Sequence, residues 1–463
     1  MFVNGKDDSG SSAICIVPSQ NGSAILVRRL GDQVELPVIS LPWQRLEFFP
    51  DHVPHIRREF AKIGVDVTVL RHLKEAVDAQ ICVIEVHGEL GPLPEGFVWL
   101  ETEPDWHDSS SWVAWEIWKE CAPATAPWER TGWFAEARDW MKDQLSKTGY
   151  AVQGPVEQIK GAWDWSSILT TNTDQGRVYL KADYAKPPKE TQVVLKLAEK
   201  WPENVPKIIA ADIERNWMLM RSFTGQYLEP LGLNAYAGAL RQYVAIQRSS
   251  ADEIKDWQAI GCFDMTPMNL LAMAERLVED SILRQPIWGL SREDLQEFRD
   301  RLPGIRELLN ELAASKLPVV IANEDFRAGN VVLDKDRYIL FDWSGTVISH
   351  PFFSLNYFLN RVIREETDNS FRWRIDLNDD RRKAYADAFL NEWTDLAPRD
   401  QIEHEFWLCR RLFHLYEAIL SNVGLPFENL ESPWGRGSLT RVSYCIRSFL
   451  AVLRTNPNTT QSH

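Results

Sequence analysis

The residues best suited to chemistry gather between positions 318 and 355. A short apolar strand, predicted at residues 319–322, leads into a polar loop that carries Asp325 and, five residues later, Asn330. A predicted hairpin follows, and Asp342 stands at its end. Because a hairpin returns the chain to its starting point, two carboxylates and one amide oxygen are expected to converge. Such hard oxygen ligands suit Mg²⁺.

Phosphoryl transfer needs little more than this set of groups. A metal and a cation must neutralise the phosphate charge, and one carboxylate must orient the attacking hydroxyl. Lys181, at the end of a predicted strand, supplies a cation, and Glu190 opens the next predicted helix and can hold the lysine in place. Each residue alone indicates little, since a strand-terminal Lys or Asp usually lies on the surface. The order Lys, Glu, Asp-x4-Asn, Asp is nevertheless distinctive.

This order resembles the aminoglycoside phosphotransferase and choline-kinase group of protein-kinase-like enzymes. The catalytic loop of that family reads His-Gly-Asp-x4-Asn, and a hairpin and an Ile-Asp-Trp-type metal motif follow it. Here residues 323–330 read Asn-Glu-Asp-Phe-Arg-Ala-Gly-Asn, and residues 341–343 read Phe-Asp-Trp. The His-Pro-Phe-Phe sequence at 350–353 matches the next stretch of the family, and the resemblance spans about residues 130–450.

The resemblance implies a role for each matched residue. Asp325 would orient the substrate hydroxyl as the base, and Asn330 and Asp342 would hold Mg²⁺. Lys181 would contact the α- and β-phosphates of ATP or GTP, with Glu190 as its partner.

Two further stretches would complete the nucleotide site. The purine ring would meet backbone groups near Arg221, Ser222 and Phe223. Ser166 and Ser167 lie where the phosphate-covering hairpin turns, and hydroxyl and backbone N–H groups can cradle phosphate there without a glycine-rich run.

Two residues depart from the family pattern, because Asn323 and Glu324 replace His-Gly before the catalytic aspartate. The family's histidine braces the loop by hydrogen bonding, which asparagine can do in part. Glu324 adds a carboxylate beside the reaction centre, where it would raise the pKa of Asp325, bind a cationic substrate or mark an inactive enzyme. The alternative to a phosphotransferase is therefore a nucleotide-binding pseudokinase or regulatory protein without turnover.

The N-terminal residues predict a separate module. Strand-like stretches and a helix at 55–63 that ends before Gly64 indicate a small α/β domain. Residues 57–64 (RREFAKIG) resemble the Nudix helix Arg-Glu-x-x-Glu-Glu-x-Gly, but Ala61 and Lys62 stand where the paired metal carboxylates belong. We therefore expect a degenerate Nudix-like module for binding or scaffolding. An unrelated α/β domain and a Nudix hydrolase with a kinase-like appendage are the alternatives, and Lys62 argues against the latter.

The predicted fold class is α+β: a bilobal protein-kinase-like fold, with a small β-rich lobe and a large helical lobe, preceded by the Nudix-like α/β domain. The expected boundaries are 1–105 for the Nudix-like domain, 106–130 for a linker with one short helix, 131–225 for the small lobe with its preceding helix, 226–453 for the helical lobe and 454–463 for a flexible tail. Within these limits a hairpin is expected at 168–172 and 177–181, and helices at 133–145, at 190–200 and after the N-cap Ser291.

The amino-acid composition limits the classes of molecule that this chain is expected to bind. The 463 residues carry 51 basic and 66 acidic side chains, a net charge of −15, which disfavours nucleic acid and anionic membranes as partners. No apolar run is long enough for a transmembrane helix, and no CxxC pair occurs among the six cysteines, so a cytoplasmic protein is expected. The expected partners are a nucleoside triphosphate and a small-molecule hydroxyl acceptor. Acidic and basic residues alternate between 361 and 382, so no anionic pocket for a polycation is predicted.

Overall fold

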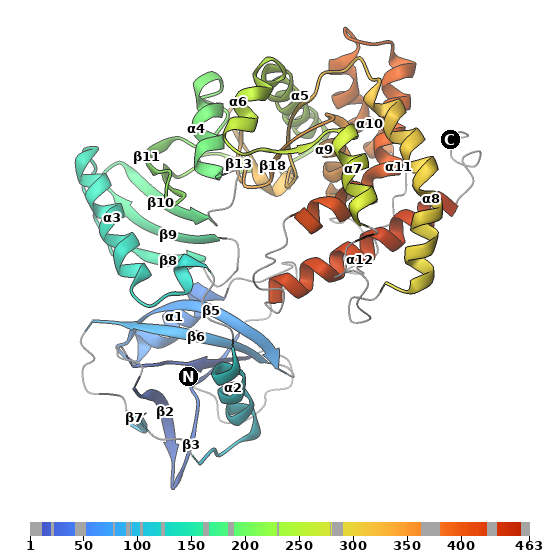
Figure 1. Cartoon of the computed structure of the whole chain (residues 1–463). Helices are drawn as coiled ribbons and strands as arrows, with labels where there is room; N and C mark the ends of the chain where they lie inside the picture. The colour runs from blue at the N-terminus through green and yellow to red at the C-terminus, as the bar shows by residue number, and fades with distance from the viewer. Residues whose placement is uncertain are drawn as a thin grey trace. The chain divides into compact units, whose positions relative to one another are not determined.

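The structure is a computed structural model of the chain (Figure 1). It describes residues 12–19, 23–41, 52–76, 79–88, 93, 95–101, 105–121, 126–160, 166–183, 189–228, 231–277, 279, 290–362, 380–423 and 433–454. The chain forms two compact units. The first unit holds residues 1–184, 208–222 and 431–433, and the second holds 185–207, 223–430 and 434–463. The finer domain boundaries stay a prediction, and most of the alternating charges near 361–382 lie outside the described residues.

The first unit begins with two sheets. One sheet has the order β4-β1-β6-β5 and the other β3-β2-β7. The strands are β1 (Ser12–Ile16), β2 (Ile25–Leu30), β3 (Gln33–Glu35), β4 (Val38–Ser40), β5 (Asp66–Ala76), β6 (Ala79–His87) and β7 (Phe97–Leu100).

Two helices cover opposite faces of the first sheet. Because side chains alternate along a strand, Ala13 and Cys15 of β1 face the core under α1 (Val53–Lys62), whereas Ile14 and Ile16 face the core shared with the second sheet. The helix α2 (Ser109–Glu120) belongs to that second core, and Asp108 caps its N-terminus. The predicted helix before Gly64 and the short helix expected in the linker are therefore confirmed.

The first unit also contains a five-stranded antiparallel sheet of order β11-β12-β10-β9-β8. Its strands are β8 (Glu157–Lys160), β9 (Ser166–Thr173), β10 (Gly176–Asp183), β11 (Ile208–Asp212) and β12 (Trp217–Arg221). The helix α3 (Trp133–Lys147) follows the 3₁₀ turn η1 (Pro127–Glu129) and buries one apolar face against this sheet (Figure 1). The predicted hairpin is confirmed as β9 and β10.

A buried glutamine links the two parts of the first unit. The side-chain amide of Gln158, on β8, accepts a hydrogen bond from the Val69 N–H and donates one to the Val69 carbonyl, both at 2.9 Å. The guanidinium of Arg57, on α1, donates to the backbone carbonyls of Val67 and Gln158. The oxygen and the nitrogen of this buried side-chain amide therefore both have backbone partners, as buried polar groups usually do. These two hydrogen bonds join the β5 edge to the five-stranded sheet.

The second unit is mostly helical. Its helices are α4 (Glu190–Lys200), α5 (Leu233–Ser250), α6 (Ile254–Ala259), α7 (Pro267–Leu277), α8 (Arg292–Ala313), α9 (Phe352–Val362), α10 (Asp380–Leu390), α11 (Arg399–Val423) and α12 (Pro433–Arg454), with 3₁₀ turns η2 (Ala251–Glu253), η4 (Ala328–Asn330) and η6 (Asn391–Trp393). Ser291 caps α8, as predicted, and it also forms reciprocal hydrogen bonds with Asp294. None of the helices in the described ranges has the length and apolar character of a membrane span.

Two small sheets of the second unit position the site. One has the order β14-β18-β15 and the other β13-β16-β17. Their strands are β13 (Gln226–Tyr227), β14 (Phe263–Met265), β15 (Val320–Asn323), β16 (Val331–Asp334), β17 (Arg337–Leu340) and β18 (Thr346–Ser349). A β-rich part and a helical part are thus present, and the predicted α+β class is confirmed.

Candidate active site

The loop that carries Asp325 leaves the end of a buried strand. All four residues of β15 are buried, and the strand pairs with β18 from Val320 to Asn323. The Asn323 N–H donates to the Tyr243 hydroxyl of α5 at 2.7 Å. The hydroxyl of Ser250, at the end of α5, accepts a bond from the Ile321 N–H. The strand end is therefore held both by its sheet and by a helix packed against it.

Asn323 braces the loop with both ends of its side-chain amide. Its Oδ1 accepts a hydrogen bond from the Asp325 N–H, and its Nδ2 donates to the Asp342 carbonyl, each at 2.9 Å. The residue is only 2% exposed. The bracing role that the sequence assigned in part to this asparagine is matched by these two contacts, which bring the loop and the end of the hairpin together.

Three donors orient the Asp325 carboxylate. Its Oδ2 accepts from Asn330 Nδ2 at 2.8 Å and from Arg327 Nε at 3.3 Å. Its Oδ1 accepts from the Tyr357 hydroxyl of α9 at 2.9 Å. The Asp325 side chain is 34% exposed, so the oriented carboxylate also reaches solvent.

The two residues assigned to the metal lie beside this carboxylate. Asn330 uses its side-chain nitrogen to bond both the carboxylate and the backbone carbonyl of Asp325, which leaves its amide oxygen as the atom suited to a cation. The Phe341 N–H donates to the Asn330 carbonyl at 3.1 Å and so places Asp342 next to the loop. One carboxylate and one amide oxygen fit Mg²⁺, which keeps waters and phosphate oxygens as further ligands.

The backbone of Asp342 supports a functional reading of this position. Its φ is +61°, in the left-handed region that a residue with a side chain rarely adopts. Such conformations persist where the surrounding structure imposes them, and they concentrate at functional sites.

Glu190 contacts the metal motif directly. Its Oε1 accepts a hydrogen bond from the N–H of Trp343, the residue after Asp342, at 2.9 Å. Glu190 is 2% exposed, and the Trp343 ring is fully buried. The first residue of α4 is therefore tied to the segment that carries Asp342.

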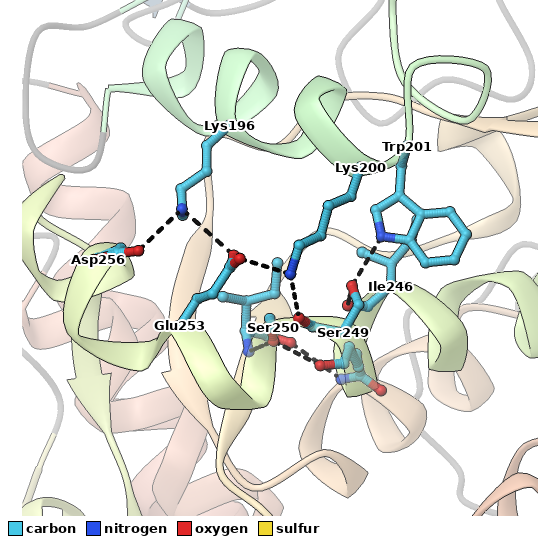
Figure 2. Close-up of polar contacts among 10 residues, drawn as sticks. Lys196, Lys200, Trp201, Ile246, Ser249, Ser250, Glu253 and Asp256 are labelled. Atoms are coloured by element: carbon cyan, nitrogen blue, oxygen red, sulfur yellow. Dashed lines mark hydrogen bonds and ion pairs between the residues drawn. The ribbon is translucent and has the colours of Figure 1, made fainter.

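The other end of α4 is anchored by a polar cluster (Figure 2). Glu253 of η2 forms ion pairs with Lys196 at 3.4 Å and with Lys200 at 2.6 Å. The indole N–H of Trp201, which follows the helix, donates to the Ser249 hydroxyl at 2.8 Å. These contacts hold α4 against the end of α5, and they limit how far Glu190 can move from Trp343.

Three aromatic rings of the second unit gather around Phe341, the residue before Asp342. Phe223 stacks on Phe341 with 4.8 Å between ring centroids, and Tyr227 meets Phe341 edge-on at 6.2 Å. The Tyr227 residue is 53% exposed. Phe223 was expected to contribute only backbone groups, so the ring stack is a feature that sequence reasoning missed.

The remaining predicted residues lie in the first unit, and their roles stay predictions. Lys181 is buried on β10, where its register partners are Ile168 and Met218. Ser166 and Ser167 begin β9 and are buried, and the Ser167 hydroxyl donates to the Lys160 carbonyl at 3.1 Å. Arg221 ends β12, with its guanidinium bonded to Gln175, and the Ser222 N–H donates to the Arg177 carbonyl. The partnership of Lys181 with Glu190 likewise stays a prediction.

The Glu324 side chain is buried against α11. It is 6% exposed, and the buried Tyr416 hydroxyl of α11 donates to its Oε1. Burial raises the pKa of Glu324 to about 8, even though the Tyr416 bond acts in the opposite direction. Burial therefore favours the protonated, neutral form of this side chain. The expectation that it offers a carboxylate to a cationic substrate does not fit this inward-facing position.

Arg327 and Tyr357 are site residues that the sequence interpretation did not name. The sequence could have pointed to Arg327, because it is a cation two positions after Asp325 on the same loop. No local sequence pattern points to Tyr357, since it stands 32 residues from Asp325 on a helix whose packing brings it to the Asp325 carboxylate.

A family model identifies the family to which this chain belongs. Residues 156–399 match the model of a family described as the phosphotransferase enzyme family. This match covers more than half of the chain, and the chain belongs to that family. A search of curated proteins finds no match.

Several solved structures are similar to this chain. A choline/ethanolamine kinase family protein from Mesorhizobium loti is 15% identical, with a TM-score of 0.45 and coverage of 70% of this chain and 99% of that chain. The streptomycin–ATP–APH(2″)-IIa ternary complex is 14% identical, with a TM-score of 0.45 and coverage of 69% and 97%. An ethanolamine kinase from Plasmodium vivax is 10% identical, with a TM-score of 0.43 and coverage of 64% and 83%.

Proposed function

We propose that this chain is a Mg²⁺-dependent phosphotransferase that moves the γ-phosphate of a nucleoside triphosphate to a hydroxyl group of a small molecule. The observation that supports it most is the Asp325 carboxylate, which three donors orient and which still reaches solvent. Membership of the phosphotransferase enzyme family supports the same reaction class.

The residues divide the work of an in-line displacement. Asp325 accepts a hydrogen bond from the acceptor hydroxyl and takes its proton as the new oxygen–phosphorus bond forms. The bond between the γ-phosphorus and the bridging oxygen breaks, and the nucleoside diphosphate leaves with that electron pair. Mg²⁺, held by Asn330 and Asp342, would neutralise phosphate charge. Arg327 places a further positive charge beside Asp325, where the transferred group would pass.

The nucleotide base has a candidate platform in the same unit. The stacked Phe223 and Phe341 rings and the exposed Tyr227 offer aromatic faces to a purine, and Phe341 directly precedes Asp342 in the sequence. The assignments of Lys181, Ser166, Ser167, Arg221 and Ser222 to the phosphates and the purine remain part of this proposal. So does a binding or scaffolding role for the N-terminal Nudix-like module, whose Ala61 and Lys62 lack the metal carboxylates.

The first test is a thermal-shift titration of the full chain with ATP and GTP, each with and without Mg²⁺. A nucleotide at about 100 times its Kd adds roughly 2.7 kcal/mol of stability. A Mg²⁺-dependent shift supports the proposal and identifies the donor nucleotide for a screen of hydroxyl acceptors. The absence of a shift with either nucleotide would overturn it.

The second test separates turnover from binding. Asp325→Asn keeps the shape of the side chain and removes the base, so the rate should fall by about 10²-fold or more while the nucleotide Kd is unchanged. Asp300→Asn, on the exposed face of α8, is the matched control and should keep full activity. Nucleotide binding with no turnover under any acceptor would instead favour the pseudokinase alternative.

A further inference from the structure

The residue before Asp325 is anchored at both its backbone and its side chain. The Glu324 N–H donates to the Gly345 carbonyl at 3.1 Å, and the carboxyl group bonds the Tyr416 hydroxyl. Tyr416 is fully buried on α11, and its ring stacks on Phe353 of α9 with 4.1 Å between centroids. The side chain of Glu324 therefore connects the Asp325 loop to two packed helices.

Among the residues that the structure describes, the charged and titratable groups around Glu324 do not offer it a free cation. From α11 it faces Tyr416 and Glu417, from α12 Arg441 and from α5 Tyr243, and its own loop continues with Asp325. The Arg441 guanidinium donates to Glu417 at 3.0 Å, so its charge is already matched by a carboxylate. The Glu324 side chain accepts its hydrogen bond from the Tyr416 hydroxyl. A hydroxyl can pair with a neutral carboxylic acid as well as with a carboxylate.

A charge at this position would oppose the proposed reaction. An ionised Glu324 would place a buried negative charge one residue from Asp325, where the effective dielectric constant is low and repulsion is strong. The same charge would repel an incoming phosphate. A protonated Glu324 avoids both effects and keeps its hydrogen bond.

We propose that Glu324 is a positioning residue that works as a neutral acid and ties the Asp325 loop to α11 through Tyr416. The inference rests on the proposed function, because the loop that Glu324 holds carries the group assigned as the base. It also explains how a glutamate is compatible with activity in place of the family's glycine. It predicts that activity declines as Glu324 loses its proton, and burial places the pKa of this carboxyl at about 8.

The experiment compares the wild-type full chain with Glu324→Gln, Glu324→Ala and Tyr416→Phe. Phosphate release from Mg²⁺–ATP into water is followed from about pH 6 to about pH 10, and the melting temperature of each variant is recorded as a folding control. Glutamine is a neutral isostere, so it should keep at least about a third of the neutral-pH rate and abolish the alkaline decline. Alanine should lose about tenfold or more, and the difference between the two variants is the rescue.

The Tyr416→Phe variant tests the proposal independently, through the direction in which the alkaline decline of activity moves. Because the Tyr416 hydroxyl lowers the pKa of Glu324, its removal should move the alkaline decline to higher pH, while the ring still packs on Phe353. A decline that is unchanged in Glu324→Gln, or that moves to lower pH in Tyr416→Phe, would overturn the proposal.

An infrared arm separates this inference from the proposed function. The wild-type minus Glu324→Gln difference spectrum at neutral pH should contain the carbonyl band of a protonated carboxylic acid, and the band should vanish at high pH. This readout needs no turnover, so a chain that turns over no nucleotide with water or with any screened hydroxyl acceptor, but shows the band, would contradict the phosphotransferase and still support a neutral Glu324. Absence of the band at neutral pH would refute the neutral acid whatever the activity.

Discussion

The Asn323→Ala substitution tests the brace on which the active-site geometry depends. It removes the acceptor of the Asp325 N–H and the donor to the Asp342 carbonyl in one step. Leaving a buried polar group without its partner costs about 1–3 kcal/mol, so the two lost bonds should destabilise the second unit by about 3 kcal/mol in total. Domains of roughly 150–250 residues lose about 2–4 °C per kcal/mol, so the slightly larger second unit should melt about 6–12 °C lower.

The matched control is Asn310→Ala, on the exposed face of α8. Its unfolding free energy should stay within about 0.5 kcal/mol of the wild type. Both variants are unfolded in urea, and Mg²⁺–nucleotide turnover is measured below the melting transition. Asn323→Ala should lose turnover more than nucleotide affinity, since the brace orients Asp325. If Asn323→Ala is as stable and as active as Asn310→Ala, the bracing argument is refuted.

Two further predictions concern other buried polar groups. Gln158→Leu should destabilise the first unit by about 1–3 kcal/mol and speed hydrogen exchange at the Val69 amide, whereas the exposed control Gln153→Leu should not; equal exchange in both would contradict a role for this amide. His350 is buried, and burial holds its pKa below the ordinary value despite the nearby Glu405, so its contribution to folding stability is present above about pH 6.5 and is lost as the pH falls. The unfolding free energy of the wild type should therefore drop more steeply on acidification than that of His350→Gln. Parallel slopes for the two proteins would exclude this linkage.

Local patterns predicted the elements that carry the site. The apolar run before Asn323, the hairpin that ends at Asp342 and the spacing of Asp325, Asn330 and Asp342 are all features of short stretches. They correspond to β15, to the β16–β17 hairpin with Lys335 at a φ of +61°, and to a loop whose polar groups meet. Backbone hydrogen bonds and turn geometry depend on a few neighbouring residues, which is why this strand, hairpin and loop could be predicted from the sequence.

Other local predictions held for the same reason. The helix that begins at Glu190 and the N-cap at Ser291 depend on residues within one or two turns. The family resemblance rests on the loop motif, and the family match includes that loop.

Only the tertiary structure decided which distant side chains complete the site. Tyr357 reaches Asp325 across 32 residues, and Tyr416 reaches Glu324 across 92. The sequence presents Glu324 as a charge beside the reaction centre, whereas packing of α11 against the loop buries it beneath a tyrosine. Burial and charge state depend on what the whole fold places around a group, and no pattern within a few residues contains that information. The types of chemical group on the Asp325 loop were thus determined by its local sequence. The burial of Glu324 and the approach of Tyr357 and Tyr416 were determined by the packing of the helices.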